Sequence, residues 1–74
     1  MAESKELIRK TISGSLRMER REHGMTQKSL GDAIEVHPST INGWEGGNGA
    51  IGLEDAWQIA DLYGISLDQL AGRA

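Results

Sequence analysis

The chain has 74 residues, a formal net charge of -3 at pH 7 and no cysteine. A chain this short forms one domain, because it buries too little surface to sustain two separate cores. Disulfide bonds and thiolate metal sites are excluded, and no apolar run approaches the roughly 18 residues that a membrane span needs. We therefore expect a single cytoplasmic domain over residues 1–74, without membrane association, cofactor or metal.

The charge changes sign along the chain. Residues 1–28 contain seven Lys and Arg against four Glu, a net charge of +3, whereas residues 29–74 contain one Arg against seven acidic residues, a net charge of -6. Phosphate binding depends on Lys and Arg that displace counterions, so a basic first part on an acidic body predicts one face turned toward a polyanion. A solvated charged helix is the alternative interpretation.

The first predicted element is a long amphipathic helix. Ile8, Ile12 and Leu16 recur every four residues between polar positions. This spacing predicts a helix from about Ser4 to His23, which Gly24 is expected to end.

Two short helices follow. Thr26 is a good N-cap for a helix of about residues 27–34. The expected apolar face of that helix consists of Leu30, Ala33 and Ile34. Pro38, a residue favoured at the first helical position, begins the next helix, in which Ile41 and Trp44 are the expected buried pair.

The last part of the chain predicts a loop and two more helices, with no strand-like alternation. Residues 46–52 are too glycine-rich to continue a helix. The apolar stripe of the fourth helix consists of Leu53, Ala56, Trp57, Ile59, Ala60 and Leu62. Gly64 is placed to cap this helix, and Ser66 begins a fifth, anchored by Leu67 and Leu70. Trp57 belongs either to the core or to a partner interface.

Residues 27–46 form a helix-turn-helix pattern. Their apolar positions are Leu30, Ile34, Val36, Ile41 and Trp44. The small Gly31 stands where two helices would cross closely. Such a motif holds its second helix at a steep angle and leaves the N-terminal side chains of that helix free to enter a major groove.

With these features the chain resembles the Cro and phage-repressor-like (XRE-type) DNA-binding domains. The matching residues are Leu16-Arg17, Arg20, Gly24-Met25-Thr26-Gln27, Leu30, Val36, Ser39-Thr40-Ile41, Trp44-Glu45, Ile59-Ala60 and Gly64-Ile65-Ser66-Leu67-Asp68. The resemblance covers about residues 12–72, and residues 1–11 extend the first helix. It implies an all-α, compact five-helix fold of the lambda-repressor type, with the third helix as recognition helix and a salt bridge between Arg20 and Glu45.

The resemblance also implies DNA contacts from the starts of the second and third helices. The residues at these positions are Thr26, Gln27, Lys28, His37, Pro38, Ser39, Thr40, Asn42 and Gly43. A helix N-terminus at Thr26 and Gln27 can hold a phosphate, and Thr40 is expected to meet the DNA backbone. Ser39 and Asn42 can hydrogen-bond base edges, and Asn is best suited to adenine. Thr26 and Ser39 also have a purely structural interpretation as capping or first-turn residues, and His37 has one as an N-cap or surface residue.

Three features depart from the family pattern. Glu35 occupies the turn position where glycine is usual, so it either adopts a left-handed conformation or changes the turn. Gly43 replaces a long polar or basic side chain. Because no Lys or Arg lies between Ser29 and Gly72, the loop after the third helix is expected to bind phosphate through backbone N–H groups of Gly46, Gly47 and Asn48.

These residues predict sequence-specific binding of double-stranded DNA by a homodimer on a palindromic operator, as a transcriptional regulator of the phage-repressor, controller or antitoxin type. The alternative is a protein-interaction module that keeps the fold without binding DNA. An enzyme is not expected. The G-x-G-x-x-G at residues 47–52 lacks the preceding strand of a dinucleotide site, and no nucleophile–base arrangement is visible.

Overall fold

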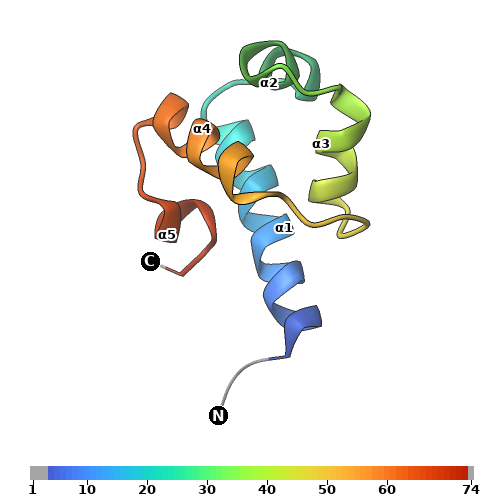
Figure 1. Cartoon of the computed structure of the whole chain (residues 1–74). Coiled ribbons are helices and arrows are strands. Elements are labelled where there is room, and N and C mark those ends of the chain that lie inside the picture. Colours follow the sequence, from blue (N-terminus) through green and yellow to red (C-terminus); the bar gives the residue numbers. More distant parts are fainter. Residues whose placement is uncertain (1–3, 74) are drawn as a thin grey trace.

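The computed structural model describes residues 4–73, which form five α-helices and no strand (Figure 1). The helices are α1 (Lys5–Glu22), α2 (Gln27–Ile34), α3 (Pro38–Glu45), α4 (Leu53–Tyr63) and α5 (Leu67–Leu70). All five predicted helices are present in the predicted order, so the all-α, five-helix fold class is confirmed.

The helix ends follow local capping chemistry. The hydroxyl of Ser4 accepts a hydrogen bond from the backbone N–H of Leu7 at 3.1 Å, and the hydroxyl of Ser66 accepts from that of Gln69 at 3.0 Å. Gly64 ends α4 in the left-handed conformation, with φ 69°. Each contact satisfies a polar backbone group that a helix terminus leaves without an intrahelical partner.

The turn between α2 and α3 is tight and includes a strained residue. Glu35 has φ 59° and ψ 46°, the left-handed conformation that was one of its two predicted states. The backbone N–H groups of Glu35 and Val36 both donate to the carbonyl of Gly31. A Cβ atom on Gly31 would collide with the carbonyl oxygen of Val36, so glycine is required for this turn to close against α2.

The helices enclose one hydrophobic core. In Figure 1, α1 runs through the centre of the molecule, α2 and α3 lie at its upper right, and α4 and α5 lie on the other side. Helix α1 contacts α3 and α5, while α2 contacts α3 and α4. The buried core side chains are Leu16, Leu30, Ile34, Ile41, Trp44, Ile59, Ala60 and Leu70. Burial of Trp44 with Ile41 agrees with the prediction.

Several apolar side chains that the sequence assigned to buried faces are exposed. They are Ile8, Ala33, Leu53, Trp57, Leu62 and Leu67. On α4 only Ile59 and Ala60 are fully buried, and Trp57 is 63% exposed. The predicted stripe was too wide, because a helix that packs on one side of a small core covers only the part of its apolar face that meets its neighbours.

The first turns of α1 project beyond the other helices (Figure 1). Within the predicted extension, residues 5–11 are helical and exposed, and residues 1–3 lie outside the described part of the chain. None of the helices in residues 4–73 combines the length and hydrophobicity required to cross a membrane.

Candidate nucleic-acid interface

The start of α2 is stabilised by a reciprocal pair of side-chain caps. The hydroxyl of Thr26 accepts from the backbone N–H of Ser29 at 3.0 Å, and the hydroxyl of Ser29 accepts from the backbone N–H of Thr26 at 2.9 Å. The N–H groups of Gln27 and Lys28, the first two helical residues, have no acceptor within the helix. These two N–H groups can therefore donate hydrogen bonds to a phosphate oxygen at this terminus.

The start of α3 is capped by the side chain of His37. The backbone N–H of Ser39 donates to Nδ1 of His37 at 3.1 Å, and the Ser39 hydroxyl lies 2.7 Å from the same nitrogen. The interpretation of His37 as an N-cap is therefore confirmed, and Ser39 is a residue of the first turn. Both residues are exposed.

The far end of α3 is held by a buried ion pair. Nε and Nη2 of Arg20, on α1, donate to the two carboxylate oxygens of Glu45 at 2.7 and 3.0 Å, and Nη1 donates to the carbonyl of Met25 at 2.8 Å. The side chains of Arg20 and Glu45 are 11% and 2% exposed. The hydrogen bond to Glu45 raises the pKa of Arg20 above its ordinary value. The salt bridge implied by the resemblance is therefore present and fixes α3 against α1.

Gln27 joins α2 to α3 through the same carboxylate. Its side-chain NH₂ group donates to Oε1 of Glu45 at 3.3 Å and to Oδ1 of Asn42 at 3.2 Å. Arg17, on α1, has its Nε 3.9 Å from the same Glu45 oxygen, and its side chain is about half exposed. Sequence reasoning placed Gln27 and Asn42 in the site separately and missed their contact, which depends on the angle between the two helices.

Lys28 and Thr40 lie at the exposed surface of the same motif. The Lys28 ammonium is 3.1 Å from Oδ2 of Asp32 one turn along α2, and both side chains are largely exposed. An exposed pair of this kind is worth well under about 1 kcal/mol, so Lys28 can exchange Asp32 for a phosphate at little cost. Thr40 is exposed on the first turn of α3 beside the half-buried Pro38.

The loop after α3 uses the backbone groups that were expected to bind phosphate. The N–H groups of Gly46, Gly47 and Asn48 donate to the carbonyls of Asn42, Trp44 and Gly43, respectively. These bonds satisfy the C-terminal carbonyls of α3. These three N–H groups are therefore used in helix capping and are not free for the phosphate contact that was predicted through them.

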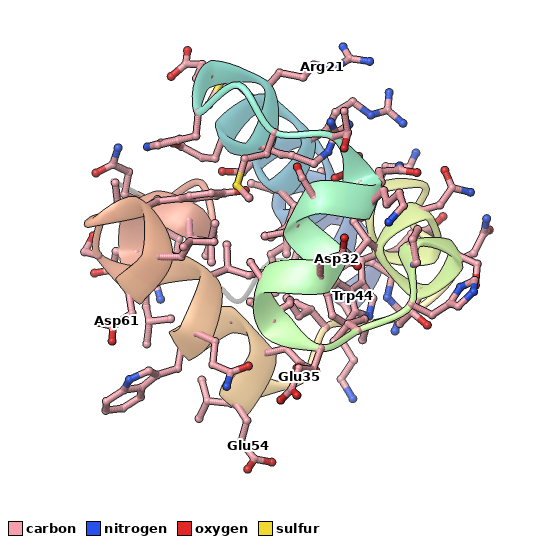
Figure 2. All side chains as sticks on the ribbon, turned by 90° about the horizontal axis from the view of Figure 1, so that it is seen from above. Arg21, Asp32, Glu35, Trp44, Glu54 and Asp61 are labelled. Carbon is pink, nitrogen blue, oxygen red and sulfur yellow. The ribbon has the colours of Figure 1, made fainter. Side chains whose placement is uncertain are left out.

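The described residues thus bring most of the predicted site together. The start of α2 lies beside the second half of α3, where Gln27 donates to Asn42 and Glu45, and the Gly43 position is open, with nothing within 4 Å of a Cβ placed there. Figure 2 shows the acidic Asp61, on α4, on the opposite side of the molecule from α3. In residues 4–73 there is no group of three or more His, Asp or Glu side chains placed to hold a metal ion.

This arrangement, two short helices at a tight turn with polar N-terminal side chains outward, defines a helix-turn-helix DNA-binding domain. The helix-turn-helix family model matches residues 16–70, and the chain belongs to this Cro and phage-repressor-like family of non-enzymatic DNA-binding proteins. The match supports a role in DNA-binding regulation of transcription. No match was found among curated protein sequences.

Two solved structures share the fold. The restriction-modification controller protein C.AhdI from Aeromonas hydrophila is 22% identical with a TM-score of 0.77, over 84% of this chain and 94% of that one. A hypothetical transcription factor, NHTF, from Neisseria is 22% identical with a TM-score of 0.79, over 96% of this chain and 84% of that one.

Proposed function

We propose that this protein is a sequence-specific regulator that binds a palindromic duplex operator as a homodimer. The observation that carries the proposal is the joint surface that the start of α2 forms with α3, to which Gln27 is hydrogen-bonded through Asn42 and Glu45. There, the free N–H groups of Gln27 and Lys28 can hold a phosphate, while Ser39 and Asn42 present polar atoms at base-contacting positions. Ion pairing by Arg20 and Glu45 holds α3 in place before DNA arrives.

Dimerisation is supported by apolar surface that the chain itself does not cover. Leu53 and Trp57, one turn apart on α4, are 72% and 63% exposed, and Leu62 and Leu67 are also exposed. Leu70 is buried in the core and Ile65 packs against it, so neither adds to this exposed apolar surface. One recognition helix contacts only a few base pairs, so a second copy about one DNA turn away provides the remaining specificity.

Binding to a random duplex at low salt, followed by fluorescence anisotropy, tests the DNA-binding role. A DNA-binding protein shows weak non-specific affinity under these conditions, whereas the alternative protein-interaction module shows none. Selection from a randomised DNA pool then identifies the operator. Replacing Asn42 with Ala should weaken the base preference at one operator position and reduce the binding free energy there by about 1–3 kcal/mol. An unchanged motif would show that Asn42 does not contact a base.

The salt dependence of operator binding measures how many cations reach phosphates. Lys28 and Arg17 are the exposed cations next to the joint surface in each subunit, so a dimer should neutralise about four phosphates and give a log–log slope near -4, at about -0.9 per phosphate. A slope steeper than about -8 would instead place Lys5, Arg9 and Lys10 at the DNA.

Sedimentation of the free protein and of its complex with the selected operator tests the dimer. A monomer in both states would overturn it. The variant Trp44→Phe leaves Trp57 as the single tryptophan, and quenching of its fluorescence by acrylamide should decrease as the protein concentration passes through the dimer dissociation constant.

A further inference from the structure

Apolar side chains that the chain leaves uncovered form one continuous surface. A groove of about 210 Å³ lies where the exposed start of α1 meets the loop after α3. A second groove follows between α1, α4 and α5, and Ile12 lines both grooves. The surface then continues over the start of α4. The apolar side chains along it are Ile8, Ile12, Ala50, Ile51, Leu53 and Trp57.

The two ends of this surface have opposite charge. Lys5 and Arg9 line the groove at the α1 end, and no acidic side chain lines it. At the α4 end, Glu54 and Asp61 lie about one turn before and one turn after Trp57, and Figure 2 shows both carboxylates directed away from the helix. Within residues 4–73 none of these charged side chains forms an ion pair. Both ends therefore present charges that a second molecule can pair.

The groove at the α1 end has the size of one large side chain. Its volume is below the range of about 300–1,000 Å³ that is typical of small-molecule sites. It is lined mainly by apolar groups, among them Ile8 and the edge of Trp44. The 63% exposed Trp57 is a side chain of this kind, and cations beside an indole add cation–π attraction. Trp57 does not line the groove of its own chain, so the indole that fills the groove comes from a second copy.

We propose that the homodimer forms by reciprocal contact, in which Trp57 of each copy enters the α1 groove of the other. This inference rests on the proposed function, because it names the surfaces of the proposed dimer. A two-fold axis that crosses the middle of the apolar surface, at right angles to the line between its ends, places each basic end on the partner's acidic end. Direct pairing of α4 with α4 would instead bring Glu54 and Asp61 of both copies together, and like charges in contact oppose association.

Charge reversal at either end tests the inference through the dimer dissociation constant, measured by sedimentation. Lys5→Glu with Arg9→Glu makes both ends acidic, and Glu54→Lys with Asp61→Lys makes both ends basic. The dissociation constant of each reversed chain alone should rise at least about a hundredfold, because like charges meet in both contacts. An equimolar mixture of the two reversed chains should dimerise within about tenfold of the wild type, because opposite charges meet again in both contacts.

Lys10→Glu with Arg21→Glu is the matched control for charge. It makes the same change in net charge on the same helix as the α1 reversal, and neither residue lines the apolar surface. Its dissociation constant should stay within about threefold of the wild-type value, because exposed charges outside a contact have small effects.

Two adjacent apolar residues of α1 test the groove itself. Ile8, which lines the groove, is 43% exposed, and Leu7, which does not, is 51% exposed. Ile8→Ala should raise the dissociation constant at least about tenfold, and Leu7→Ala should raise it less than about threefold. Equal dissociation constants for these two variants would overturn the inference.

The outcomes separate the inference from the proposed dimer. If the wild type is a dimer and either reversed chain, folded as judged by thermal unfolding, dimerises as the wild type does, the inference is overturned and the homodimer stands. A mixture of the two folded reversed chains that stays monomeric overturns the inference as well. If the wild type is a monomer both free and on its selected operator, the proposed homodimer fails and the inference fails with it.

Discussion

The two tryptophans mark regions of the molecule with opposite surfaces. Trp44, on α3, is 7% exposed, and Figure 2 shows it in the interior beside α2. Trp57, on α4, is 63% exposed and lies one turn from the exposed Leu53. Around Trp44, apolar groups are covered and the charged Glu45 is paired, whereas the α4 face has apolar side chains in solvent. The α2–α3 region is thus complete within one chain, and the α4 face is the part that another molecule can still cover.

The largest expected difference between the regions concerns the tryptophans themselves. Trp44→Ala should cost about 3–5 kcal/mol, because it leaves a cavity in the core, and this is a large part of the stability of a small domain. Trp57→Ala should change the stability of the monomer by no more than about 0.5 kcal/mol. Urea unfolding at low protein concentration measures both. Equal losses would show that α4 is packed as tightly as α3.

The ion pairs give the next difference. Glu45→Gln strands the buried charge of Arg20 and should cost about 3 kcal/mol, whereas Asp32→Asn, which breaks the exposed pair with Lys28, should cost less than about 0.5 kcal/mol. For a domain of this size the first change lowers the melting temperature by more than about 12 °C. A wild-type melting temperature for Glu45→Gln would mean that the pair is hydrated in solution.

Two glycines in the helix-turn-helix should respond in opposite directions. Gly31→Ala should cost about 1–3 kcal/mol, because the new Cβ meets the backbone of Val36 and Pro38. Gly43→Ala has open space around its Cβ and should stabilise α3 by about 1 kcal/mol through helix propensity. Thermal unfolding of the two variants measures both changes in stability. A stabilised Gly31→Ala would show that the turn can open without loss.

The smallest effect is expected at Tyr63, on the inner side of α4. Its hydroxyl is buried without a hydrogen-bond partner among the described residues, and its ring stacks on His23 at 4.2 Å between centroids. Tyr63→Phe should therefore leave the stability at pH 7 unchanged or raise it by up to about 1 kcal/mol. A loss of more than about 1 kcal/mol would reveal a partner for this hydroxyl.

Tyr63 should also make the stability of the folded state decrease at alkaline pH. Burial raises the pKa of Tyr63 to about 12 from the ordinary value of 10.0. The folded state therefore holds this proton at a pH where the unfolded chain has released it. The contribution of the protonated Tyr63 to the free energy of unfolding is fully present below pH 10, and it is lost as the pH rises from 10 toward 12. Tyr63→Phe should lack this part of the alkaline decline in unfolding free energy.

Helix positions and most of the candidate site could be predicted from the sequence because they depend on local chemistry. Ser4, Thr26, Pro38 and Ser66 define helix starts through hydrogen bonds or backbone angles within one turn. Seven of the predicted DNA-contacting residues, 26–28 and 37–40, lie at two of these starts, so their positions on the fold followed from the helix assignment.

Only the tertiary structure decided which part of each apolar stripe is covered and which polar groups meet across helices. Periodicity gave Trp57 and Leu53 the same weight as Ile59, yet only the last is buried, because a small core covers a narrow part of α4. The loop N–H groups are used by the C-terminal carbonyls of α3, and Gln27 meets Asn42 fifteen positions away along the chain. Such contacts depend on the angle between helices, which local sequence signals do not determine.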